Sequence, residues 1–237
     1  MRQRTAFDAT KSHASPIVRA TFAANLDVMS LPPDIEIKRP RAAHENIFLL
    51  GPGGVGKSTL GIELARQGGW PLIDLDLEFC HRVAVIGPFI ASRGYEAYRL
   101  ENLRLATKLV AGLTQPTLLV TSSGFLTAPP DSDDHRGALA LVRSGYGITV
   151  LPSLDLDEAT EIVVARQLTR GFGFEREEQA RKFQHRFEIY RDKGDMLVVS
   201  TAPVSEMAGA IMAVLGGLGE RPSAQTLTAR SGLPTPR

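Results

Sequence analysis

One short segment restricts the fold of this chain more than any other: residues 51–58 read GPGGVGKS. They match the pattern Gly-x-x-x-x-Gly-Lys-Ser and directly follow the apolar run 47–50, which predicts a strand. Leu60 and Leu64 then recur at helical spacing and predict a helix over 58–67. In a strand, glycine-rich loop and helix in this order, backbone N–H groups and the positive end of the helix face a phosphate group.

The motif assigns roles to its polar residues. Lys57 is expected to bridge the terminal phosphates of a nucleotide, and the hydroxyl of Ser58 to bind Mg²⁺. We expect ATP rather than GTP, because no Asn-Lys-x-Asp guanine-binding motif is present. The third predicted strand ends in residues 121–124 without a carboxylate, which argues against a motor-type ATPase. The predicted ATP-binding residues are Gly51, Pro52, Gly53, Gly54, Val55, Gly56, Lys57, Ser58 and Thr59.

Apolar runs alternate with helical periods through the rest of the chain, which predicts parallel strands joined by crossover helices. The fold class is therefore α/β, a five-stranded parallel sheet of the P-loop NTPase type with helices on both faces. The predicted strands are 47–50, 72–76, 117–121, 148–151 and 196–199. The predicted domains are an N-terminal extension, partly irregular, over 1–45, a P-loop domain over 46–216 and a flexible C-terminal tail over 217–237. Residues 129–137 are predicted to be a polar loop.

Composition narrows the classes of partner. The 27 Lys and Arg residues nearly balance the 26 Asp and Glu residues, which gives no reason to expect a nucleic-acid or anionic-membrane surface. No apolar run reaches the roughly 18 residues that a membrane-spanning helix needs. The single cysteine, Cys80, excludes an intrachain disulfide. We expect a cytoplasmic protein whose partner is a small molecule; its oligomeric state stays open.

Two carboxylates mark the second predicted strand. Asp74 and Asp76 are two residues apart, so in a strand both side chains point to the same face. We place this strand beside the P-loop strand, where its carboxyl end enters the ligand crevice. Like charges there require compensation, which Mg²⁺ and a hydroxylated substrate provide.

At this point the chain resembles the shikimate kinases, over about residues 46–215. These kinases transfer the γ-phosphate of ATP to a ring hydroxyl of shikimate. The resemblance depends on the following segments: the glycine loop 51–59, Pro71–Asp76, Gly94 with Tyr98 and Arg99, Thr121–Gly124, Arg186 with Tyr190, and Gly194 with Asp195.

The resemblance implies a role for each matching residue. Asp74 holds magnesium through water, while Asp76 binds the acceptor hydroxyls and takes up the proton. Arg99 and Arg186 clamp the substrate carboxylate, for which the planar guanidinium is suited. The substrate site is completed by Ser123 and Gly124, and the catalytic residues are Lys57, Asp76 and a lid arginine, here Arg170.

The chain departs from the family pattern in three places. Ser122 and Ser123 replace two glycines of a Gly-Gly-Gly turn, the Arg-Pro pair of the lid is missing, and Asn102 stands where the family has an acid. These changes leave the acceptor open. The alternatives are a kinase for another metabolite, such as a sugar acid or a nucleoside, and an ATP-binding regulatory protein without catalytic activity.

Overall fold

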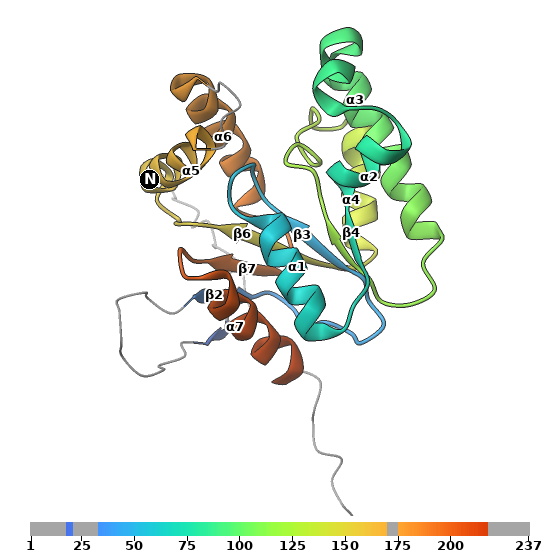
Figure 1. The fold of residues 1–237 in the computed structure, drawn as a ribbon. Coiled ribbons are helices and arrows are strands. Elements are labelled where there is room, and N and C mark those ends of the chain that lie inside the picture. The colour runs from blue at the N-terminus through green and yellow to red at the C-terminus, as the bar shows by residue number, and fades with distance from the viewer. Residues whose placement is uncertain (1–17, 21–32, 170–174, 218–237) are drawn as a thin grey trace, which may run out of the picture.

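The computed structural model describes residues 18–20, 33–169 and 175–217, and its strands form one sheet in the order β1-β2-β7-β6-β3-β5-β4 (Figure 1). The strands are β1 Val18–Ala20, β2 Asp34–Ile37, β3 Ile47–Leu50, β4 Leu72–Asp74, β5 Leu118–Val120, β6 Tyr146–Leu151 and β7 Met196–Val199. The helices are α1 Lys57–Gly68, α2 Leu75–Arg82, α3 Ile86–Ala111, α4 Asp133–Arg143, α5 Leu156–Leu168, α6 Arg176–Tyr190 and α7 Val204–Gly217. Within these ranges we find no helix with the length and apolar character required to cross a membrane.

The predicted α/β class is confirmed, with one difference in the number of strands. Five strands, β4, β5, β3, β6 and β7, run parallel, as predicted. The sheet contains seven strands rather than five because β2 pairs antiparallel with β7, with Ile35 opposite Val198, and β1 pairs with β2. The alternating pattern of β2 is too short to be distinguished from irregular chain in the sequence.

Alternate residues of the central strand β3 point to opposite faces of the sheet, and helices cover both faces. Ile47 and Leu49 belong to the apolar cluster that includes buried residues of α1 and α7. Phe48 and Leu50 belong to a second cluster, built with α2, α3 and α4. All four side chains are buried, so the P-loop strand is fixed between two layers of helices.

The region of Asp74 and Asp76 differs from the prediction. β4 ends at Asp74 and α2 begins at Leu75, so the two carboxylates do not share one strand face. The reason is helix capping: Asp74 Oδ1 accepts hydrogen bonds from the backbone N–H groups of Asp76 and Leu77. The placement of this strand beside β3 was also wrong, since β5 lies between β3 and β4.

The predicted polar loop over 129–137 is wrong in its second half. α4 begins at Asp133, and Ser132 caps it by accepting a hydrogen bond from the N–H of His135. Asp133 and Asp134 in the first turn complement the positive end of the helix. A serine followed by acids is a helix-start signal that the loop prediction overlooked.

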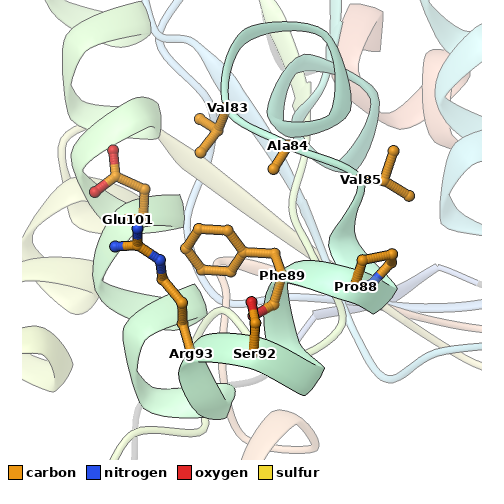
Figure 2. Close-up of a pocket in the computed structure, with 8 residues that line it drawn as sticks. All are labelled: Val83, Ala84, Val85, Pro88, Phe89, Ser92, Arg93 and Glu101. Atoms are coloured by element: carbon orange, nitrogen blue, oxygen red, sulfur yellow. The ribbon is translucent and has the colours of Figure 1, made fainter.

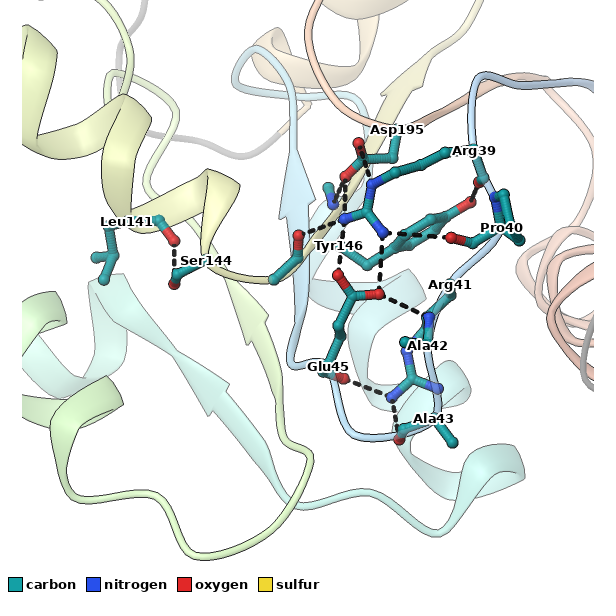
Figure 3. Close-up of polar contacts among 12 residues, drawn as sticks. Arg39, Pro40, Arg41, Ala42, Ala43, Glu45, Leu141, Ser144, Tyr146 and Asp195 are labelled. Atoms are coloured by element: carbon teal, nitrogen blue, oxygen red, sulfur yellow. Dashed lines mark hydrogen bonds and ion pairs between the residues drawn. The ribbon is translucent and has the colours of Figure 1, made fainter.

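The segment between β2 and β3 is fastened to the sheet by Arg39 (Figure 3). Its guanidinium donates to both carboxylate oxygens of Asp195, to Glu45 and to the carbonyl oxygen of Gly145. It also lies over the ring of Tyr146, with Cζ 5.0 Å from the ring centroid. The start of the domain at residue 46 stays a prediction, but the sheet itself takes in β1 and β2 from the segment before that residue.

We expect Arg39→Ala to lower the free energy of unfolding by about 2 kcal/mol, because the carboxylates of Glu45 and Asp195 lose their shared cation. Urea unfolding of both proteins measures the difference. Arg104→Ala is the control: Arg104 pairs with Glu101 on the surface of α3, and its loss should cost less than about 0.5 kcal/mol. Equal stability of Arg39→Ala and the parent would contradict a fastening role.

Candidate active site

The phosphate loop has the backbone shape that its motif requires. β3 leads into residues 51–56, and α1 starts at Lys57 immediately after Gly56, which has a φ of 96°. Gly51 has a φ of 139°, and a Cβ there would lie 2.7 Å from the carbonyl oxygen of Val150. Gly54 has a φ of 86°, and its Cβ would lie 2.7 Å from a methyl group of Val163. The loop therefore requires glycine at both positions.

Lys57 lies across its own loop. The side chain is buried, and Nζ donates to the carbonyl oxygens of Gly51 and Pro52 over 2.8 and 2.9 Å. Ser58 and Thr59 follow in the first turn of α1 and are exposed. The ammonium group therefore lies against the start of the loop, and Ser58 follows in the first turn of α1. The phosphate-binding role of Lys57 and the magnesium-binding role of Ser58 stay predictions.

Asp76 lies in the first turn of α2, where two hydroxyl groups hold its carboxylate. The Tyr98 hydroxyl donates to Oδ1 over 2.9 Å, and the Ser122 hydroxyl donates to the same oxygen over 2.5 Å. Asn102 is buried, and its Oδ1 lies 3.1 Å from Ser122 Oγ. Among the described residues, none hydrogen-bonds the second carboxylate oxygen, Oδ2.

The hydroxyl of Tyr98 remains a donor at neutral pH. Burial raises the pKa of Tyr98, and the neighbouring charge of Asp76 raises this pKa further. Tyr98 therefore stays protonated and orients the carboxylate instead of repelling it. Neutral Asn102, at the family's acidic position, adds no second negative charge beside Asp76.

Arg186 reaches the site from α6. Its Nη1 donates to Ser123 Oγ and its Nη2 to the hydroxyl of Tyr95, each over 3.0 Å. The Tyr95 hydroxyl also covers Gly124: a Cβ built at residue 124 would lie 1.7 Å from it. Of the predicted substrate-binding residues, Arg186, Ser123 and Gly124 are therefore brought together.

Arg99 forms an ion pair with Asp134 of α4. Nε and Nη2 lie 3.2 and 3.0 Å from Asp134 Oδ2, and the two side chains are 16% and 9% exposed. The ring of Tyr95 lies near the guanidinium, with its centroid 5.8 Å from Cζ. Arg99 thus lies beside the predicted site but already has a carboxylate partner.

We expect Asp134→Asn to lower the free energy of unfolding by about 3 kcal/mol, because Arg99 loses a buried counter-ion. Burial alone would raise the pKa of Asp134, but hydrogen bonds from Ser132 and Arg99 outweigh it and hold this pKa below its ordinary value. A lowered carboxylate pKa stabilises the fold above the unfolded pKa, and this contribution is lost as the pH falls through the folded pKa. The difference in the free energy of unfolding between the variant and the parent should therefore be largest at neutral pH and decrease as the pH falls.

Urea unfolding at neutral and acid pH tests this prediction. Asp133→Asn is the matched control, since the Asp133 side chain is 97% exposed and should change stability by less than about 0.5 kcal/mol. A difference for Asp134→Asn that persists in acid would show that the ionised carboxylate is not its source.

The structure places the remaining predicted residues as follows. Asp74 caps α2, and Arg170 lies outside the described residues. Ser123 adjoins the phosphate loop, because a Cβ on Gly53 would lie 3.5 Å from Ser123 Cβ. The acceptor-side residues and the nucleotide loop therefore meet at this point, between α2, α3 and α4 on one side and α5 and α6 on the other (Figure 1).

Several residues of the site were not assigned from the sequence. Tyr95 and Ser122 contact predicted site residues directly, and Asn102 supports Ser122. Asp134 was set aside as part of a loop. The sequence pattern that could have indicated Asp134 is the helix start after Ser132. No comparable local pattern indicates Tyr95, because its partner Arg186 is on a distant helix.

A pocket of about 670 Å³ lies elsewhere, on the outer side of the α2–α3 turn (Figure 2). Val83, Val85, Phe89 and Arg93 are among its lining residues, and none of the residues that line it belongs to the phosphate loop or contacts Asp76. It is a surface feature separate from the site described above.

A glycine loop between the central parallel strand and a helix, with helices on both faces of the sheet, defines a P-loop nucleotide-binding protein. The comparison with protein families is more specific. The shikimate kinase model matches residues 53–216, more than half of the chain. The chain belongs to the shikimate kinase family.

Individual relatives agree with this assignment. A shikimate kinase of Histophilus somni is 39% identical over 100 residues, which are 42% of this chain and 54% of that protein. A pentafunctional AROM polypeptide of Yarrowia lipolytica is 24% identical over 213 residues, 86% of this chain but 13% of that polypeptide. The chain thus spans about half the length of the first relative and a small part of the second.

Among solved structures, a shikimate kinase from Acinetobacter baumannii in complex with shikimate superimposes with a TM-score of 0.58. The match covers 73% of this chain and 93% of that chain at 21% identity. At this identity the similarity establishes a shared fold.

Proposed function

We propose that this protein is an ATP- and magnesium-dependent kinase that transfers the γ-phosphate of ATP to a hydroxyl group of an anionic, hydroxylated metabolite, with shikimate as the first candidate. The substrate is a small molecule and the compartment the cytoplasm; the balanced charge of the chain gives no reason to add nucleic acid or a membrane as a partner.

The observation that carries the proposal is the position of Asp76. Its Oδ1 is fixed by Tyr98 and Ser122, so Oδ2 has a defined orientation. Ser123, the next residue after Ser122, lies close to the phosphate loop: a Cβ built on Gly53 would be 3.5 Å from Ser123 Cβ. A carboxylate held beside a nucleotide loop is the arrangement that a hydroxyl acceptor of a phosphoryl group requires.

The transfer step follows from these positions. An acceptor hydroxyl donates its hydrogen bond to Asp76 Oδ2, and its oxygen attacks the γ-phosphorus of ATP. The new O–P bond forms as the bond between the γ-phosphorus and the β–γ bridging oxygen breaks, so ADP leaves with the bond electrons. Asp76 takes up the hydroxyl proton, and Lys57 neutralises the charge on the phosphates.

The residues present fit a magnesium ion bound with ATP. Ser58 offers an exposed hydroxyl at the start of α1. Asp74 uses Oδ1 to cap α2, so its other oxygen is the one that would hold a water molecule of the ion. When bound, magnesium neutralises phosphate charge during transfer.

ADP formation with and without shikimate tests the proposal. We expect MgATP turnover that depends on shikimate, and the appearance of a phosphorylated product by mass spectrometry. ATP binding without turnover on any hydroxylated acid would favour the regulatory alternative, a nucleotide-binding protein that has lost transfer activity.

A second candidate is a kinase for a different hydroxy acid. The side chain of Ser123 occupies space that the family's glycine turn leaves open, and it contacts Arg186. A panel of hydroxy acids and sugar acids in the same ADP assay separates this candidate from shikimate.

A further inference from the structure

Tyr95 lies between the two arginines that were expected to clamp the acceptor. Its hydroxyl accepts a hydrogen bond from Arg186 Nη2 over 3.0 Å. Its ring centroid lies 5.8 Å from Cζ of Arg99. The same side chain therefore contacts both predicted ligands of the acceptor carboxylate.

Tyr95 also covers the turn that follows β5. The hydroxyl lies so close to Gly124 that a Cβ at residue 124 would be 1.7 Å from it. The other end of the Arg186 guanidinium donates to Ser123. The guanidinium therefore has two neutral partners, Ser123 on the turn and Tyr95 on α3. The phenol hydroxyl thus occupies the space in which a side chain at residue 124 would lie.

The helical backbone of α3 is interrupted directly before Tyr95. Gly94 has a φ of 85° and a ψ of 163° inside α3, which divides the helix into two arms directly before Tyr95. A Cβ at Gly94 would meet no atom within 4 Å, so the tight packing that restricts other glycines is absent there among the described residues. A change in the Gly94 dihedrals would therefore move Tyr95 without a clash at residue 94.

We propose that Tyr95 is a further residue of the acceptor site, one that occupies the place of the acceptor's anionic group on Arg186 until the acceptor displaces it. This inference rests on the proposed function, because it takes Arg186 as the acceptor's ligand. A carboxylate displaces the phenol because a hydrogen bond between two charged groups is stronger than one from a guanidinium to a neutral hydroxyl. The acceptor's apparent affinity is reduced by the fraction of molecules in which Tyr95 holds Arg186.

Tyr95→Phe is the sharpest test, since it keeps the ring and removes only the hydroxyl that accepts from Arg186 and covers Gly124. With shikimate as the acceptor probe, we expect its KM to fall by about tenfold, the change that follows from one lost competing hydrogen bond. The KM for ATP and kcat should stay as in the parent. Tyr146→Phe is the matched control: the Tyr146 hydroxyl donates to the carbonyl oxygen of Arg39, away from the site, and its loss should not change the KM for shikimate.

A second measurement does not depend on the identity of the acceptor. Phenylglyoxal modifies accessible arginines, and the rate at Arg186 can be followed by peptide mass spectrometry. We expect faster modification of Arg186 in Tyr95→Phe than in the parent, while Arg99, held by Asp134, serves as the internal reference.

The outcomes separate the two proposals. In one outcome, Arg186 is modified faster in Tyr95→Phe than in the parent while neither protein turns over shikimate. That result would support the contact of Tyr95 with Arg186 and would exclude shikimate as the acceptor. A rise in the KM for shikimate would overturn the inference, because Tyr95 would then be positioning Arg186 for the acceptor. Equal modification rates in the variant and the parent would overturn it as well.

Discussion

Lys57→Met is expected to lower ATP-dependent phosphoryl transfer by about 10³-fold, the loss seen when a charge-stabilising donor is removed from a transition state. Lys57 is the lysine of the glycine loop, and its Nζ already lies against the loop carbonyl oxygens of Gly51 and Pro52. Methionine has a similar length and no charge, so it should keep the packing and lose the phosphate contact. The two lost hydrogen bonds should cost about 1 kcal/mol each in stability.

ADP release and thermal unfolding should be measured on the same preparations. Lys108→Met is the matched control, since Lys108 is exposed on α3 and contributes nothing to the loop. Turnover close to that of the parent in a folded Lys57→Met protein would refute the assignment of this loop to catalysis.

The parts of the fold that could be predicted are those whose causes lie in consecutive residues. The apolar run 47–50, the glycines after it and the helical spacing of Leu60 and Leu64 are all local. The structure accordingly has β3 and α1 within one residue of the predicted bounds. Helices on both faces follow from alternating strand and helix patterns in the same way.

The errors occur where a tertiary or capping interaction decides the outcome. Leu75 and Asp76 suit a strand by pattern, but the carboxylate of Asp74 caps a helix that starts at once. β2 has only four residues, and its place in the sheet depends on pairing with β7, which is more than a hundred residues later. Local propensity does not encode that pairing.

In the candidate site, too, features that depend on consecutive residues could be predicted, and features that depend on tertiary contacts could not. The residues of the glycine loop follow from their motif, whereas the contact between Asp76 and Ser122 and the partners of the arginines do not. Arg99 meets Asp134 from α4, and Arg186 meets Tyr95 from α3. These contacts join helices far apart in the chain, so only the packed structure shows which carboxylate or hydroxyl each arginine contacts.

Asp76→Asn is expected to lower kcat by about 10² to 10⁴-fold, the range that general-base catalysis contributes. Asparagine keeps the size of the side chain and still accepts hydrogen bonds from Tyr98 and Ser122 through its amide oxygen. An NH₂ group then replaces Oδ2, and this group has no basic lone pair to take up the acceptor proton. The KM for ATP should stay as in the parent, because the phosphate contacts belong to the glycine loop.

The separation between kcat and KM distinguishes a catalytic Asp76 from a structural one. Asp157→Asn, an exposed residue in the first turn of α5, is the matched control and should leave both constants as in the parent. Ser122→Ala leaves the carboxylate in place but removes one of the two hydroxyls that orient it, so we expect an intermediate loss of about tenfold in kcat. If Asp76→Asn instead transfers phosphate at the parent rate, the acceptor proton goes elsewhere, and the carboxylate held by the hydroxyls of Tyr98 and Ser122 serves to position the first turn of α2.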